Sequence, residues 1–325
     1  MTYIDNKKIN YVHDLMHEIL VFRYESKKET YLTLLIELCN YLTDQIDRDQ
    51  VDYSLEIKQK IDEIEKYDYN SEEIRLVMQL LIVSGLKHKN IPLDVMTPDG
   101  IALMFAFIIK GIFNNKNELS ILDLAVGTGN LLLSIANHIE SKEVTLTGIE
   151  HNELLIQVAK ANADMQYHEI DLFFQDALQH TFLAPDIIIA DFDTYEYNNN
   201  QYQSKLYQLG VRDFPYLAIE KHLGSGHEGT FHLYLIPNDF FSRPHSQEMK
   251  QLMDEYCEML ALIVLPNSMF VDQSKSKSML LLKNKPTNTK AKRQCEVIHL
   301  PSSEHVESFS KVLHYISALL VTFTQ

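Results

Sequence analysis

The segment from Leu119 to Ile139, LSILDLAVGTGNLLLSIANHI, constrains the fold of this chain more than any other. Strand-like residues at Ile121–Leu124 run into a turn that contains Gly127 and Gly129, and apolar residues at helical spacing follow. The glycines permit backbone conformations that a Cβ atom forbids, and they let a ligand approach the main chain. The first N–H groups of the following helix face that ligand. We therefore predict a strand, a glycine turn and a helix that bind a cofactor.

Two classes of cofactor use a glycine turn of this kind, and the residue spacing distinguishes them. A dinucleotide-binding fingerprint, G-x-G-x-x-G/A, needs a small residue at the position of Leu132. The other pattern, D-x-A-x-G-x-G, begins here at Asp123 and is found in S-adenosylmethionine (SAM) methyltransferases. The spacing therefore disfavours a nicotinamide oxidoreductase.

The segment Asp123–Asn130 resembles motif I of the class I SAM-dependent methyltransferases. The order of the other motifs is similar to that of the N6-adenine DNA methylases, in particular their small YtxK-like branch, from about Thr97 to Lys285. The resemblance implies an α/β fold, a Rossmann-like three-layer sandwich with a reversed last strand. It also implies SAM as the cofactor and methyl transfer to an amino nitrogen, with nucleic acid as the acceptor.

The resemblance also assigns roles to residues near the predicted strand ends. Thr97-Pro98, ahead of an apolar helix that Thr97 or Asp99 can cap, would border the methionine end of SAM. Glu150 follows the second predicted strand, where an acid can accept hydrogen bonds from both ribose hydroxyls. Asp176 would accept from the adenine amino group, and Ala177 would lie against the ring. The predicted cofactor-binding residues are Thr97, Pro98, Asp123, Ala125, Gly127, Gly129, Asn130, Glu150, His151, Asp176, Ala177 and Asp191.

The catalytic motif is predicted where the apolar run Asp186–Ala190 carries Asp191 to the carboxyl end of the sheet. N6-adenine methylases have Asn/Asp-Pro-Pro-aromatic here: the polar side chain and a backbone carbonyl hold the amino group, and the aromatic ring stacks on a flipped base. This chain has Asp191-Phe192-Asp193-Thr194-Tyr195, which keeps the acid and lacks both prolines. A non-catalytic SAM-binding sensor or scaffold is therefore the alternative function.

The residues around the altered motif suggest which groups replace the missing ones. Phe192 can present an aromatic face, and Tyr195 or Tyr197 can substitute from the following polar loop. Asp193 adds a carboxylate that would repel DNA phosphates and suit an amine. We therefore predict Asp191 and Tyr195 as catalytic residues, with weak or absent methylation of ordinary duplex DNA.

The remaining strands and helices are predicted from apolar runs and periodicity. The polar segment after residue 265 is too short for a crossover helix, so the strands on either side of it should be antiparallel. The predicted strands are Glu143–Ile149, Glu169–Phe174, Asp186–Ala190, Thr230–Ile236, Met259–Leu265, Ser278–Lys283 and an edge strand at Ile298–Leu300. The predicted helices are Ile101–Ile109, Asn152–Met165, Tyr216–Leu223, His245–Tyr256 and Val306–Phe323.

Residues 1–90 contain no proline and one glycine, and their apolar residues recur at three- and four-residue intervals. We predict an all-helical N-terminal domain over 1–90, followed by a methyltransferase domain over 91–325. Ser71 would cap the last helix and Gly85 would end it. The domain could serve in homodimerisation, partner binding or as a lid. The predicted helices are His13–Tyr24, Thr30–Asp47, Ser54–Tyr67 and Ser71–Gly85.

The net charge and the cysteine content limit which partners and which cellular location are expected. The net charge of −16 argues against broad attraction to nucleic acid, so the basic stretch Lys275–Arg293 is the predicted phosphate contact, with a solubilising loop as the alternative. Cys39, Cys257 and Cys295 lack metal-ligand spacing, which predicts no metal site and suits a reducing cytoplasm. The apolar run Ile101–Ile109 is too short to span a bilayer, so we expect no membrane partner.

Overall fold

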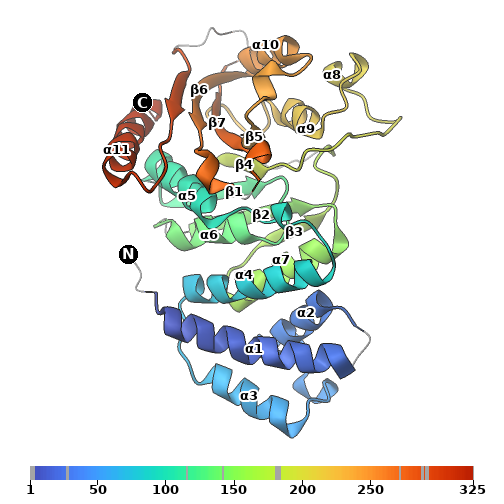
Figure 1. Cartoon of the computed structure of the whole chain (residues 1–325). Coiled ribbons are helices and arrows are strands. Elements are labelled where there is room, and N and C mark those ends of the chain that lie inside the picture. The colour runs from blue at the N-terminus through green and yellow to red at the C-terminus, as the bar shows by residue number, and fades with distance from the viewer. Residues whose placement is uncertain are drawn as a thin grey trace.

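The computed structural model describes residues 4–26, 29–114, 116–140, 143–179, 184–270, 272–286, 289 and 293–324. Within these residues a mixed sheet of 8 strands has the order β3-β2-β1-β4-β5-β7-β6-β8. The helices α1–α4 lie at one end of the molecule, next to α7, and α10 and α11 lie at the other (Figure 1). The strands are β1 Glu118–Asp123, β2 Glu143–Glu150, β3 Asp171–Phe174, β4 Ile187–Asp191, β5 Phe231–Pro237, β6 Cys257–Val264, β7 Lys277–Asn284 and β8 Glu296–His299.

From α5 to β3 the helices alternate with the strands, as the predicted α/β fold requires, and α8 to α10 and α11 follow among the later strands. No helix in the described part of the chain is long and apolar enough to cross a bilayer. The α-helices are α1 Asn6–Ser26, α2 Tyr31–Leu42, α3 Leu55–Glu65, α4 Ser71–His88, α5 Asp99–Phe113, α6 Asn130–His138, α7 Glu153–Met165, α8 Lys205–Gln208, α9 Phe214–His222, α10 Ser246–Tyr256 and α11 Val306–Phe323.

The reversed strand is β7, which confirms the predicted antiparallel arrangement. It pairs antiparallel with both β5 and β6, whereas the pairs among β1 to β5 are all parallel. In this register Pro237, the last residue of β5, lies beside Lys277, the first residue of β7. The start of β7 therefore lies at the same edge of the sheet as the carboxyl ends of β4 and β5.

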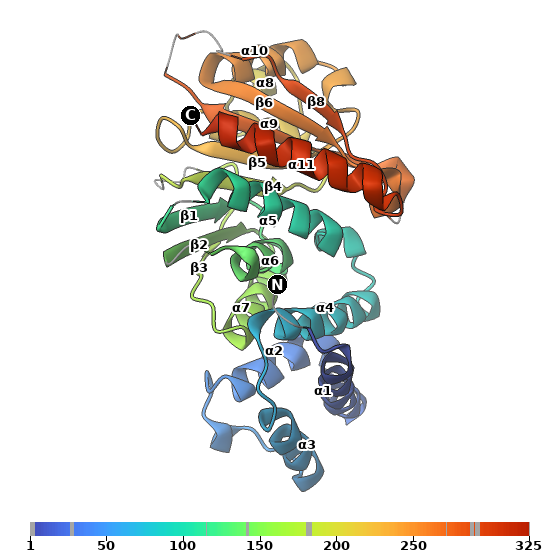
Figure 2. The same cartoon turned by 90° about the vertical axis from the view of Figure 1, so that its left-hand side faces the viewer.

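Apolar side chains on both faces of the sheet form the core, which explains why β4 is a continuous apolar run. Ile187 and Ile189 pack on the side covered by α5, α6 and α11, whereas Ile188 and Ala190 pack on the side of α9 and α10 (Figure 2). All four residues are fully buried. Because parallel strands buried on both faces need apolar residues throughout, this pattern identified β4 from the sequence.

The N-terminal helices confirm the predicted helical character and correct two details. Asn70, not Ser71, caps α4, because the Asn70 side chain accepts from Glu73 N while the Glu73 side chain accepts from the Asn70 backbone. Gly85 does not end α4, which runs on to His88. A Cβ atom at Gly85 would lie 2.3 Å from Cδ2 of Leu32, so the glycine allows α4 to pack closely on α2.

The apolar cluster of these helices is not closed within residues 1–90. It continues into α7 through side chains that pack with those of α1 to α4. The contributing residues of α7 are Leu155, Val158, Ala161 and Met165. The N-terminal helices and the sheet region thus share one hydrophobic cluster.

Candidate functional site

The glycine turn after β1 has the positive-φ backbone that its sequence predicts. Gly127 has φ 55° and Gly129 has φ 82°, in the left-handed region that favours glycine. A Cβ atom at Gly127 would lie 2.9 Å from the carbonyl oxygen of Val95, so no larger residue fits without movement. The Gly127 N–H donates to Oε2 of Glu150 at 3.0 Å, which ties the turn to the end of β2.

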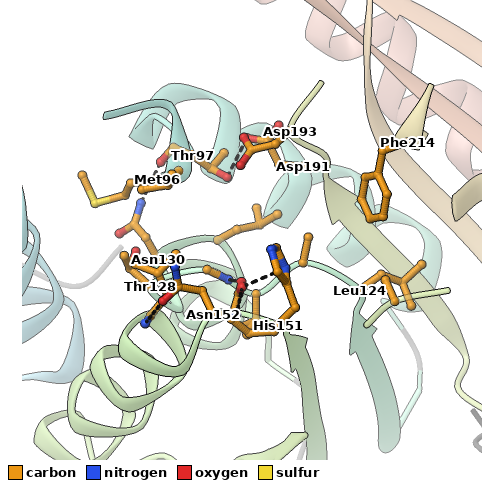
Figure 3. A pocket seen from close by; sticks show the side chains of 18 of the residues that line it. Met96, Thr97, Leu124, Thr128, Asn130, His151, Asn152, Asp191, Asp193 and Phe214 are labelled. Carbon is orange, nitrogen blue, oxygen red and sulfur yellow. Dashed lines mark hydrogen bonds and ion pairs between the residues drawn. The ribbon is translucent and has the colours of Figure 1, made fainter. Parts of the chain in front are cut away.

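A cavity of about 190 Å³ lies over this turn, at the carboxyl ends of β1, β2 and β4 (Figure 3). It brings together residues that were predicted from three separate strand ends. Pro98, Asp123, Gly129 and Asp176, which were predicted with them, do not line it. The predicted residues that do are Thr97, Ala125, Gly127, Asn130, Glu150, His151, Ala177, Asp191 and Tyr195.

Glu150 lines this cavity with its carboxylate largely buried. Oε2 accepts from Gly127 N, and Oε1 accepts from Asn152 N at 2.8 Å and lies 3.3 Å from Nδ1 of His151. A carboxylate offers about four lone-pair positions, so Glu150 can still accept hydrogen bonds from a diol such as ribose. The residues present therefore fit the ribose of SAM.

Asp123 lies behind the turn rather than in the cavity. Its side chain is fully buried, Oδ1 accepts from Ala125 N at 3.0 Å, and Oδ2 has no hydrogen-bond partner. Burial, together with the charges of Asp191 and Glu150, raises the pKa of Asp123 to about 7, although the bond from Ala125 N opposes the shift. An unsatisfied buried carboxyl oxygen behind this wall suits a cofactor that carries positive charge.

Asp176, predicted to read the adenine amino group, already has a partner on each oxygen. Oδ1 accepts from Leu178 N and Oδ2 accepts from the Tyr197 hydroxyl, both at 2.8 Å. Its neighbours Gln175 and Ala177 line the cavity instead. The proposed contact of Asp176 with adenine thus requires a free lone pair or displacement of Tyr197.

Asp191 lies where the first cavity meets a second one, and both of its oxygens are engaged. The Thr97 hydroxyl donates to Oδ2 at 2.9 Å, and the Lys277 ammonium forms an ion pair with Oδ1. Lys277 Nζ also donates to the carbonyl oxygen of Phe192 at 3.2 Å. Thr97 therefore does not cap α5, as the sequence had suggested, and neither does Asp99, since α5 begins after Pro98 without a side-chain cap.

The aromatic residues after Asp191 occupy different environments. Phe192 is fully buried and packs against Phe214 and Tyr234, so it cannot present a face to a ligand as predicted. Tyr195 lines the first cavity and stacks on Phe214, with ring centroids 4.5 Å apart and an interplanar angle of 17°. Burial and the nearby carboxylates Asp176 and Asp193 raise the pKa of Tyr195. Tyr195 is thus the motif aromatic that faces the cavity.

Arg75 links the helical part of the chain to the turn, and its side chain is only 1% exposed. Nη1 donates to Oδ1 of Asn130 at 2.7 Å and to Asp99 at 2.9 Å, while Nε and Nη2 bind both oxygens of Glu72. Asn130 in turn donates from Nδ2 to the Thr97 carbonyl oxygen at 2.8 Å. A continuous set of hydrogen bonds therefore runs from α4 to the residue that holds Asp191.

The second cavity, of about 700 Å³, adjoins the first through Met96, Asp191 and Asp193, which line both. Its wall also contains Pro98 and the 3-10 segment that precedes β7. Apolar side chains and side chains of both charges line it, so it is a mixed chamber on the far side of Asp191. The charged residues of its wall are Asp191, Asp193, Asp239, Arg243, Asp272, Lys275 and Lys277.

The basic residues of the predicted stretch Lys275–Arg293 lie near opposite ends of β7 and beyond it. Lys277 lies at the start of the strand against Asp191, whereas Lys283 donates to the carbonyl of Phe323 near the other end. Arg293 donates to Thr322 of α11 at 2.9 Å. Lys290 and Lys292 lie outside the described residues. The described basic residues thus do not form one continuous row.

Three residues that line this site or bind its residues were not predicted as parts of it: Lys277, Arg75 and Phe214. The signal for Lys277 was present, because a reversed strand must begin where its parallel neighbours end. Arg75 and Phe214 carried no such signal, since a charged residue within a helix and an aromatic residue near a helix start are both common.

Comparisons with known proteins agree with this arrangement. A profile of the N-6 DNA Methylase family matches residues 94–317. The Bacillus subtilis protein YtxK, described as uncharacterized, is 31% identical over 300 residues, 90% of this chain and 91% of YtxK. A Listeria monocytogenes structure assigned to the class I SAM-dependent methyltransferases has a TM-score of 0.85 and 22% identity, covering 97% of this chain and 100% of that one. The type I restriction-modification methyltransferase subunit of Streptococcus thermophilus has a TM-score of 0.60 and 13% identity, covering 89% and 74%.

Proposed function

Because this chain belongs to the N-6 DNA Methylase family, we propose that it binds SAM and transfers the methyl group to an amino nitrogen. The observation that carries the proposal is the meeting of two cavities at Asp191. The first has a buried acid, Glu150, that accepts a hydrogen bond from the glycine turn, which suits a nucleoside. The second cavity would let a methyl acceptor reach the Asp191 carboxylate without passing through the first cavity.

The residues of the chain would bind, orient and exclude water. SAM, when bound, supplies a methyl group on a positively charged sulfur. Glu150 would hold the ribose, and the carboxylates on both sides of the wall would favour the positive charge. Asp191 would accept a hydrogen bond from the amino group and so direct the nitrogen lone pair. The nitrogen would gain the methyl carbon while the carbon–sulfur bond breaks, its electron pair would stay on sulfur, and the nitrogen would release one proton to water.

We propose adenine in nucleic acid as the first acceptor to test, with duplex DNA as a poor one. The family supports nucleic acid, Lys275 in the wall of the second cavity could contact a phosphate, and Tyr195 could stack on an extruded base. Asp193 and Asp239 on the acceptor side would repel a phosphate backbone. Single strands and small amines bring less phosphate charge into this chamber.

A second candidate is a non-catalytic protein that senses SAM. The ion pair between Lys277 and Asp191 favours it, because the carboxylate expected to hold the acceptor is already neutralised. The helices α1 to α4 would then transmit the bound state to a partner or to a second copy. A reducing cytoplasm as the location belongs to the same proposal, since Cys39, Cys257 and Cys295 are free.

A calorimetric titration with SAM and with NAD, followed by a transfer assay, tests these alternatives. We expect SAM to bind and NAD not to bind. Glu150→Ala should lose about 1.5–3 kcal/mol of SAM affinity, roughly ten- to hundred-fold, because two hydrogen bonds to ribose disappear. The exposed acid Glu169 provides a control, and Glu169→Ala should bind SAM as the wild type does. No binding at millimolar SAM would refute the proposal.

Labelled-methyl incorporation into single-stranded DNA, duplex DNA, RNA, protein extract and small amines then separates the enzyme from the sensor. An enzyme should label at least one acceptor class in a way that Asp191→Ala abolishes while SAM binding is retained. Robust labelling of duplex DNA, or undiminished transfer by the variant, would contradict the role given to Asp191. SAM binding without transfer to any acceptor would favour the sensor.

A further inference from the structure

The acceptor side of Asp191 is already occupied by an amine of the protein itself. Lys277 Nζ donates to Oδ1 of Asp191 and to the Phe192 carbonyl oxygen, 3.2 Å away. Asp191 lines both cavities, whereas Lys277 lines only the larger one and Phe192 is buried behind them. The Lys277 side chain is 16% exposed and that of Asp191 is 8% exposed. The lysine therefore forms a buried contact rather than a loose surface pair.

An amino group that enters this place needs the same oxygens. A nitrogen that is to be methylated must aim its lone pair at the methyl carbon, so its N–H groups must be held by acceptors on another side. The other oxygen of Asp191 already accepts from Thr97. An incoming amine therefore competes directly with Lys277 for Oδ1 of Asp191, and displacement of the lysine also releases the carbonyl oxygen of Phe192.

We propose that Lys277 is an internal occupant of the acceptor position, which blocks methyl transfer until a substrate displaces it. The inference rests on the proposed transfer to an amino nitrogen. Lysine suits this role because its ammonium sits on a long, flexible stem. The adjoining chamber of about 700 Å³ gives the displaced side chain room to move. The block selects for acceptors that bind well enough elsewhere in the chamber to expel the lysine.

The first test removes the ammonium group of Lys277 and keeps an unbranched side chain of similar length. Lys277→Met should raise the kcat/KM for methyl transfer to a single-stranded adenine oligonucleotide or to simple amines by ten-fold or more. The SAM dissociation constant should stay unchanged, because Lys277 does not line the first cavity. Lys311→Met is the control, since Lys311 also pairs with a carboxylate, Glu307, but lies on α11 with 74% of its side chain exposed. Transfer that falls or stays constant in Lys277→Met would overturn the proposal.

A second measurement does not depend on turnover. Brief acetylation of the full protein, read by mass spectrometry, should label Lys277 far more slowly than Lys311, and Asp191→Ala should abolish this protection. Equal labelling of the two lysines in the wild type would overturn the proposal, even if the protein transfers no methyl group. Methylation of Lys277 after incubation with SAM would overturn it too, because the residue would then be an acceptor. Failure of the proposed function is recognised separately, by the absence of SAM binding.

Discussion

Replacing Arg75 by methionine tests whether the helical part of the chain helps to build the cofactor site. The substitution replaces the apolar stem of the side chain by one of similar length and removes the guanidinium group with its charge and its N–H donors. It leaves Glu72, Asp99 and Asn130 without the cation that now binds them. Breaking a buried ion pair on one side costs about 3–5 kcal/mol, because the remaining charge stays buried and uncompensated. Since domains are stable by only about 5–15 kcal/mol, the loss should be large.

Urea unfolding at neutral pH measures this loss, and Arg48→Met is the matched control. Arg48 also binds two carboxylates, Asp44 and Glu65, but its side chain is 38% exposed, and exposed pairs contribute at most about 1 kcal/mol. We expect Arg75→Met to lower the free energy of unfolding by about 3–5 kcal/mol and Arg48→Met by less than about 1 kcal/mol. Similar losses in the two variants would refute the reasoning from burial.

SAM affinity of the folded Arg75→Met protein provides the functional half of the test. Arg75 orients the Asn130 side chain, whose amide donates to the Thr97 carbonyl at the edge of the cavity. Loss of that orientation should weaken SAM binding by several-fold, whereas Arg48→Met should leave it unchanged. A destabilised variant with wild-type SAM affinity would show that Arg75 supports the fold alone.

Two further predictions concern the turn. The raised pKa of Asp123, about 7, means that the folded state holds an extra proton between about pH 4 and 7, so its stability falls as pH rises through that range. The free energy of unfolding of Asp123→Asn relative to wild type should therefore rise by up to about 4 kcal/mol over this range, and a pH-independent difference would contradict the shift. Gly127→Ala should lose SAM affinity in calorimetry, because alanine costs about 1–2 kcal/mol at positive φ and its Cβ would meet the Val95 carbonyl. Gly210→Ala, with positive φ but nothing within 4 Å, should be destabilised without losing SAM affinity, and equal affinities would refute the role of the turn.

The sheet could be predicted from the sequence because its signals are local. The apolar run within Asp186–Ala190 made β4 recognisable. The spacing of Gly127 and Gly129 after Asp123 is typical of few folds, and it made the β1–α6 unit recognisable. The reversed β7 followed from the short polar connection before it. Gly85 was predicted to end α4, because glycine is common just after the end of a helix. It lies within α4 instead, where its lack of a side chain makes room for Leu32, a residue distant in sequence.

The site could be predicted less completely, because its decisive contacts join distant residues. Lys277 is 86 positions from Asp191, and the run of basic residues around it suggested phosphate binding instead. Arg75 is 55 positions from Asn130, with no pattern that connects them. Residues at strand ends converge by topology, so Glu150 and Asp191 could be placed together, whereas partners brought by helices and by β7 depend on packing angles and register.

The hydrophobic cluster that α1 to α4 share with α7 has a consequence for synthesis of the protein on the ribosome. About 80 residues are added between His88 and Met165, which takes roughly 4–15 s at about 5–20 residues per second. During this interval the apolar side chains of the first helices have emerged, but Leu155, Val158 and Met165, which complete their packing, have not. The nascent chain therefore carries an uncovered apolar surface for seconds, and it is in this period that a chaperone would bind it.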